Sequence, residues 1–204
     1  MPVKTLSKLF FLTVLTIIAM NIKDYYLGVQ HPGYYFNILM SLIPVALLSV
    51  LKAIYVRTCD LTHPGLLIVF GAWMIFFPNS AYLVIDPYLH VQNVVDAIAY
   101  LPSVILGTTI AISSFKEIDD IVSVGIDETV SSIILVTMFF ISSFGLYLGL
   151  FGRWNSWDLF TQPVSLLAWS IDNLLISTPF CLVSTTSLAV GYFYGKKILN
   201  PSII

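Results

Sequence analysis

Asp86 and His90 lie four residues apart, just beyond a long apolar stretch. Side chains at this spacing share one face of a helix, so the carboxylate can orient the imidazole for general acid/base work or join it as a metal ligand. Asp86 followed by Pro87 is also typical of an N-cap and first turn that open a short interfacial helix. One Asp and one His do not by themselves make a metal site, and we expect no cofactor. Asp86 and His90 are candidate catalytic residues, and Asp96 is a candidate binding residue.

A second polar group follows the fifth apolar stretch, in residues 152–158, which read GRWNSWD. The planar guanidinium of Arg153 suits a phosphate or carboxylate of a ligand, or a structural tie to an acid on the same side. Arg153 and Asp158 are candidate catalytic residues, and the binding candidates here are Trp154, Asn155 and Trp157. Three of the four tryptophans fall between residues 154 and 169, as an aromatic belt at headgroup level requires. Residues 164–172 are expected to form a short amphipathic helix in the interface.

Asn79 is the third candidate, in a stretch that reads FFPNSAY from Phe76 to Tyr82. Pro78 has no amide hydrogen to donate to the previous turn, so the helix is expected to bend or break there. A carbonyl group is then left free beside the Asn79 amide. Asn79 therefore either repairs the kink or lines a binding site.

The elements that must position these residues follow from composition. The chain has 204 residues, of which 58% are hydrophobic and 10% charged, and its mean hydropathy is +0.92. A water-soluble domain of this size cannot bury so many apolar side chains. The predicted fold is all-α, a polytopic transmembrane helical bundle that forms a single integral membrane domain over residues 1–204. Its six expected spans, each near the roughly 20 residues that cross a bilayer, are 6–22, 37–56, 65–85, 94–115, 129–151 and 173–194.

Lysine and arginine residues set the orientation of these spans. With a cytoplasmic N-terminus, only Lys23 and Arg153 lie outside, whereas seven bases lie inside. The inner bases are Lys4, Lys8, Lys52, Arg57, Lys116, Lys196 and Lys197. This positive-inside bias predicts that both termini are cytoplasmic. The outer side also holds an excess of acids, and all three candidate groups fall on it.

The remaining charges exclude several classes of protein. Residues 116–120 and 127–128 carry mixed charges and are expected to form a solvated connection. The net charge of −2 leaves no basic patch for nucleic acid. A P-loop, a dinucleotide fingerprint and the common hydrolase motifs are absent from the sequence, so those chemistries lack support. The expected partners are the lipid bilayer and, on the outer face, a lipid or headgroup ligand or a membrane partner protein.

The FFPN and RWNSWD motifs together resemble the bacterial membrane proteins catalogued as domain of unknown function 1361. The resemblance extends from about the second span to the sixth and implies a multi-pass protein of the bacterial plasma membrane, with no assigned activity. The chain departs from the family pattern in three places. The turn after Asn79 reads Ser-Ala-Tyr rather than Ala-Pro-Tyr, Ile85 replaces a Thr before Asp86, and His90 follows Asp86 by four residues rather than three. These departures weaken a mechanism that needs one fixed Asp–His geometry.

Three functions are compatible with these features. The favoured one is a binding or scaffolding protein in an envelope process. An alternative is an outward-facing enzyme acting on a lipid-linked or headgroup substrate, with Asp86 or His90 as acid/base and Arg153 as an anion clamp. The third is a small-solute transporter with the broken helix near Asn79 as its site.

Overall fold

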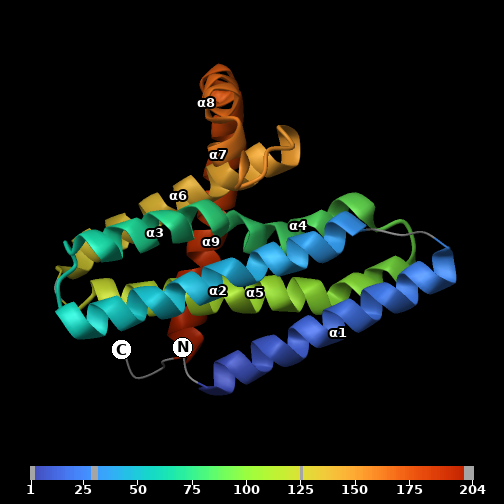
Figure 1. Cartoon of the computed structure of the whole chain (residues 1–204), viewed down its shortest axis with the longest axis horizontal. Coiled ribbons are helices and arrows are strands. Elements are labelled where there is room, and N and C mark those ends of the chain that lie inside the picture. The colour runs from blue at the N-terminus through green and yellow to red at the C-terminus, as the bar shows by residue number, and fades with distance from the viewer. Residues whose placement is uncertain (1–2, 29–31, 125, 200–204) are drawn as a thin grey trace. The chain divides into compact units, whose positions relative to one another are not determined.

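The computed structural model describes residues 3–28, 32–124 and 126–199, and all regular secondary structure within them is helical (Figure 1). Six segments of the described chain are long and apolar enough to cross a membrane, with α3 and α4 together supplying one of them. The predicted all-α fold with six spans is therefore confirmed. The helices are α1 (Val3–Leu27), α2 (Pro32–Thr58), α3 (Pro64–Phe76), α4 (Pro78–His90), α5 (Val94–Val122), α6 (Glu128–Phe151), α7 (Asp158–Thr161), α8 (Pro163–Asp172) and α9 (Leu174–Leu199).

Most of the spanning helices are longer than the apolar stretches predict. α1 continues through Lys23 to Leu27, and α5 continues through residues 116–120 to Val122. The expectation of a solvated connection at 116–120 is therefore wrong. Helical hydrogen bonds do not require apolar side chains, and charged residues near the end of a span stay in the helix when they find partners.

The start of α3 follows from its local sequence. His63 is the N-cap, its Nδ1 accepts a hydrogen bond from the Gly65 amide, and Pro64 occupies the first turn, where an amide hydrogen is not needed. In the preceding turn, the Thr62 amide and hydroxyl both donate to the Asp60 carboxylate. These hydrogen bonds hold the pKa of Asp60 below its usual value. The turn between α2 and α3 is thus closed by local polar contacts.

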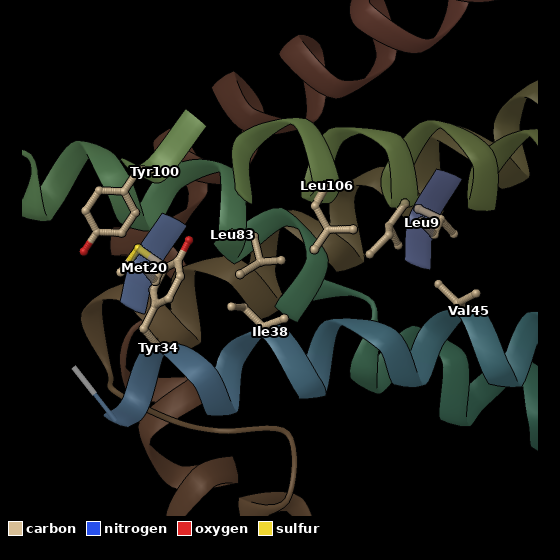
Figure 2. Packing of buried hydrophobic residues seen from close by; sticks show 9 residues of the cluster. Leu9, Met20, Tyr34, Ile38, Val45, Leu83, Tyr100 and Leu106 are labelled. Carbon is tan, nitrogen blue, oxygen red and sulfur yellow. The ribbon is translucent and has the colours of Figure 1, made fainter. Parts of the chain in front are cut away.

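Contacts divide the chain into two compact units. The first unit is Met1–Ile118. Its α2 packs along both α3 and α4, and its core is shared by α1, α2, α4 and α5. Figure 2 shows Met20, Tyr34 and Tyr100 together at one end of this core. At Gly107 of α5, an added Cβ would lie 2.6 Å from the carbonyl oxygen of Ser80. The backbones of α4 and α5 therefore approach closely, which is how helices without a large hydrophobic driving force associate in lipid.

The second unit is Asp119–Ile204, and its main contact is between α6 and α9. Small polar residues lie in this contact, where the Thr185 hydroxyl donates to the Ser143 hydroxyl at 3.2 Å. Aromatic rings pack farther along α6, with the Tyr147 ring centroid 5.7 Å from that of Phe180. α7 and α8 lie in the connection between α6 and α9, where the sequence predicts a short helix.

Candidate functional site

Asp86 and His90 meet in the last turn of α4. His90 Nδ1 lies 3.2 Å from Asp86 Oδ1 and 2.9 Å from the main-chain oxygen of Asp86. Both neighbours are acceptors, so Nδ1 is the nitrogen that carries the proton of a neutral ring, and Nε2 then has a free lone pair. Asp86 is buried, whereas the His90 side chain is 43% exposed. The expected placement on one helix face is confirmed.

The alternative interpretation of Asp86 as an N-cap is wrong. α4 begins at Pro78 and continues through Asp86 and Pro87 to His90. Pro87 removes one amide donor from the interior of the helix, and the next turn still closes because the Val91 amide donates to the Pro87 carbonyl at 2.8 Å. A proline near the end of a membrane helix does not interrupt the helix when the neighbouring residues keep their own hydrogen bonds.

Asp96 lies in the first turn of α5 and closes it in two ways. The Asp96 amide donates to Asn93 Oδ1 at 2.9 Å, and Asp96 Oδ2 accepts from the Gln92 amide at 3.1 Å. This reciprocal arrangement resembles a capping box, which satisfies amides that the helix leaves without partners. Asp96 is nevertheless buried, so its other carboxylate oxygen needs a partner from elsewhere in the fold.

Asp96 Oδ1 accepts no hydrogen bond within the described residues, and its partner is instead an ion-pair partner, Lys23 of α1. Its Nζ lies 3.5 Å from Asp96 Oδ1, donates to the Tyr100 hydroxyl at 3.2 Å, and stands 4.3 Å from the centroid of the Tyr100 ring. Only 3% of Lys23 is exposed, although it was predicted merely as one of two bases on the outer side. An ammonium group at this depth requires a carboxylate partner, and the aromatic face adds a cation–π contact. The Lys23–Asp96 pair therefore joins α1 to α5.

Tyr34 completes this end of the first unit. Its ring packs edge to face against Tyr100 with centroids 5.2 Å apart (Figure 2), and Asp86 lies within electrostatic range of both hydroxyls. Sequence reasoning missed Lys23, Tyr34 and Tyr100 because aromatic residues and a terminal lysine are ordinary at a membrane boundary. The available signal was that Lys23 and Asp96 fall at the same predicted side of two different spans.

Asn79 lies where the helical hydrogen-bond ladder is interrupted. Pro78 separates α3 from α4, yet Phe77 keeps right-handed helical angles, with φ −57° and ψ −38°. Asn79 Nδ2 donates to the Phe76 carbonyl at 2.9 Å, while the Ser80 hydroxyl reaches the Ser41 carbonyl of α2 at 3.3 Å. The expected break is confirmed, and the Asn79 amide bonds a carbonyl beside it, as the repair interpretation predicts, whereas the Ser80 hydroxyl contacts α2.

Asp158, in the second unit, holds a local turn together. Its Oδ2 accepts from the Asn155 amide at 2.7 Å and from Asn155 Nδ2 at 3.4 Å, and its Oδ1 accepts from the Thr161 hydroxyl at 3.2 Å. All of these partners lie within three residues of Asp158 in the sequence. The carboxylate therefore stabilises the connection between α6 and α7 in the way that Asp residues stabilise turns and helix starts.

Arg153 is exposed, unlike the three acidic candidates Asp86, Asp96 and Asp158. Within the described parts of the chain it forms no ion pair, and the expected tie to an acid is not observed there. The physical reason is that Asp158 is already occupied by its own turn. Arg153 also has a positive φ of 57°, which is uncommon for a residue with a side chain. The next amide, that of Trp154, reaches back to the Leu148 carbonyl at 3.1 Å and fixes this bend.

The two tryptophans of this turn are placed differently. Trp154 is partly buried, and its indole Nε1 is buried with no hydrogen-bond partner among the described residues. Trp157 uses its main-chain carbonyl to accept from the Phe160 amide at 2.9 Å at the start of α7. The structure thus brings the five candidates between Arg153 and Asp158 into one turn, while the other four, Asn79, Asp86, His90 and Asp96, belong to the first unit.

A further pair of acids lies near the predicted cytoplasmic ends, where no site was expected. Glu117 pairs with Lys52 of α2, and both residues belong to the first unit. In the second unit, Asp119 is buried and accepts from the Tyr192 hydroxyl at 2.7 Å and from the Ser123 hydroxyl at 2.9 Å. Glu117 thus joins α5 to α2 within the first unit, and Asp119 joins the end of α5 to α9 within the second.

The comparisons with known proteins bear on this set of residues. The family described as protein of unknown function (DUF1361) matches over residues 36–191, about three quarters of the chain. The chain belongs to the DUF1361 family. No curated protein and no solved structure matches it. The chain is therefore a DUF1361 protein with six membrane-spanning segments, an integral membrane protein of unassigned function.

The DUF1361 match covers the candidate residues but not the lysine that pairs with one of them. Every candidate residue from Asn79 to Asp158 falls inside residues 36–191, and so do Tyr100 and Asp96. Lys23 and the rest of α1 precede the match. The lysine that neutralises Asp96 thus comes from a part of this chain to which the DUF1361 match does not extend.

Proposed function

We propose that this DUF1361 protein is a binding or scaffolding component of an envelope process in the bacterial plasma membrane. Because successive spans alternate in direction, the connections after α1, α4 and α6 are expected on one side of the membrane, which the distribution of bases predicts to be the outer side. The observation that carries the proposal is the Lys23–Asp96 pair with its contact to Tyr100. Charges that bind one another inside the fold hold helices in place and leave little capacity for a substrate.

The contacts of the other candidates point in the same direction. Asn79 supports an interrupted helix, and Asp158 stabilises its own turn. His90 and Arg153 are the exposed charged candidates, so they are the residues through which a ligand or partner protein is contacted. The proposal therefore separates residues that stabilise the protein from residues that contact a partner.

The test is complementation of a strain that lacks the gene, with the amount of folded protein in the membrane measured for each variant. If the protein is a scaffold, Asp86→Asn and Asp96→Asn reduce complementation only in proportion to the loss of folded protein in the membrane. Asp172→Asn is the matched control because Asp172 is an exposed acid on the predicted outer side. A fully folded Asp86→Asn protein that fails to complement contradicts the scaffold proposal.

A second candidate function, an enzyme acting on a lipid-linked or headgroup substrate, is favoured by the Asp86–His90 geometry. A buried carboxylate beside Nδ1 fixes the ring and leaves Nε2 as a general base, as in other carboxylate–histidine pairs. Purified protein in nanodiscs of phosphatidylglycerol and phosphatidylethanolamine should then change the headgroup composition, as followed by mass spectrometry. His90→Ala should abolish the change while the melting temperature is kept, and turnover that survives this substitution excludes the mechanism.

A further inference from the structure

One face of α8 is an exposed apolar surface of the second unit. Val164, Leu167 and Ile171 are 79%, 61% and 64% exposed, and none of the residues of α8 is buried. Their spacing of three and then four residues places them on one helical stripe. This apolar stripe needs a covering in any environment that contains water.

The opposite face of α8 is held against the end of α6. The Trp169 ring centroid lies 6.0 Å from that of Tyr147, and a Cβ added at Gly152 would lie 2.9 Å from Trp169 Cη2. The close approach requires glycine at position 152. Because Trp169 fixes how α8 rotates about its axis, the stripe of Val164, Leu167 and Ile171 is directed away from α6.

The spanning helix that follows, α9, begins directly after α8 and also exposes apolar side chains. Leu175 comes four residues after Ile171 and is 86% exposed, and Val183 and Val190 extend the exposed apolar surface along α9. That part of α9 lies in the segment Leu174–Tyr194, which is apolar and long enough to cross the membrane. A surface that is continuous with the lipid-facing surface of a span is covered by the same lipid.

Arg153 supplies the charge at this end of the unit. It directly follows Gly152, which contacts Trp169, and it is exposed without an ion pair within the described residues. The other base on the predicted outer side, Lys23, is already paired with Asp96. A guanidinium at headgroup level, with Trp154 and Trp157 beside it in the sequence, complements a phosphodiester anion in charge and in geometry.

We propose that α8 lies at the membrane boundary with its stripe toward the acyl chains, and that Arg153 binds the phosphate of a phospholipid in the leaflet in which α6 ends. The guanidinium binds the lipid phosphate, and Val164, Leu167 and Ile171 lie at the boundary of the acyl chains. This inference rests on the proposed function in one respect, that Arg153 contacts a partner. It deepens that function by naming the partner as a phospholipid.

The first experiment measures the depth of α8 in vesicles of phosphatidylcholine and phosphatidylglycerol. Spin labels are placed on single cysteines at Val164, Leu167 and Ile171, with Ser165 and Asp172 as exposed controls, in a protein whose Cys59 and Cys181 are replaced. Labels on the stripe should collide preferentially with oxygen, and labels on the controls with a water-soluble nickel chelate. Equal access of the nickel chelate to both sets overturns the proposal, as does dipolar broadening at Leu167 that reveals a second copy of the chain.

The second experiment tests Arg153 by titrating a spin-labelled phosphatidylglycerol into the purified protein. Arg153→Gln should weaken binding roughly tenfold, as expected when one charge-assisted contact is lost, and Arg153→Lys should weaken it less. Lys8→Gln is the control, since Lys8 is also exposed but lies on α1. Unchanged binding by Arg153→Gln contradicts the proposal, and so does displacement of the lipid by inorganic phosphate, because the site then takes any anion. Neither result depends on the complementation test of the scaffold.

Discussion

The polar end of the first unit and the Arg153–Asp158 turn of the second unit contain the same kinds of residue but use them differently. In the first unit, Lys23 and Asp96 come from α1 and α5 and are buried against each other. In the second unit, Asp158 binds groups within three residues of itself, and Arg153 stays exposed. A charge whose partner lies on another helix fixes the helices, whereas a charge satisfied locally leaves its neighbours available for binding.

The largest expected effect is that of breaking the long-range pair. Lys23→Met keeps an apolar side chain of similar length but leaves Asp96 buried without its cation, so the free energy of unfolding should fall by about 3 kcal/mol. Reversible unfolding in mixed detergent micelles measures this loss. Lys8→Met, an exposed lysine on the same helix, should have almost no effect.

The double variant sharpens this result. Adding Asp96→Leu to Lys23→Met removes the uncompensated charge, and most of the lost stability should return. If Lys23→Met proves as stable as Lys8→Met, the pair does not hold the helices, and the contrast between the two regions fails.

A smaller loss of stability is expected from separating α4 and α5 in the first unit. Gly107→Ala places a Cβ against the Ser80 carbonyl, so α4 and α5 must move apart at a cost of about 2 kcal/mol. Gly71→Ala is the matched control, because no atom lies within 4 Å of the added Cβ. Thermal unfolding of both variants in nanodiscs measures the difference, and equal melting temperatures would show that the close approach is not required.

The smallest effect is expected in the second unit. Asp158→Ala removes only local hydrogen bonds and should cost about 1 kcal/mol, the usual value for losing a cap. Hydrogen exchange at the Asn155 amide should rise, because that amide loses its acceptor. Asp172→Ala is the exposed control. A loss as large as that of Lys23→Met would mean that Asp158 also has a partner on another helix.

The sequence by itself determined the class of protein and the number of spans. Long apolar stretches leave no other way to satisfy the backbone in lipid, so the helices follow from composition, as does the break at Pro78 from its missing amide hydrogen. The spacing of Asp86 and His90 also determined their contact, because residues four apart meet on any helix. These features depend on residues that are close in the sequence or on whether the surroundings are lipid or water. Local sequence and overall composition therefore suffice to predict them.

Only the tertiary structure decided which charges are paired. Lys23 and Asp96 are separated by more than seventy residues, and nothing in the local pattern of either indicates that they meet. Arg153 and Asp158 are five residues apart and oppositely charged, yet they form no ion pair, because the backbone turns between them and Asp158 accepts from the Asn155 amide. Pairing in a membrane protein depends on how helices pack, and packing places residues that are distant in sequence side by side.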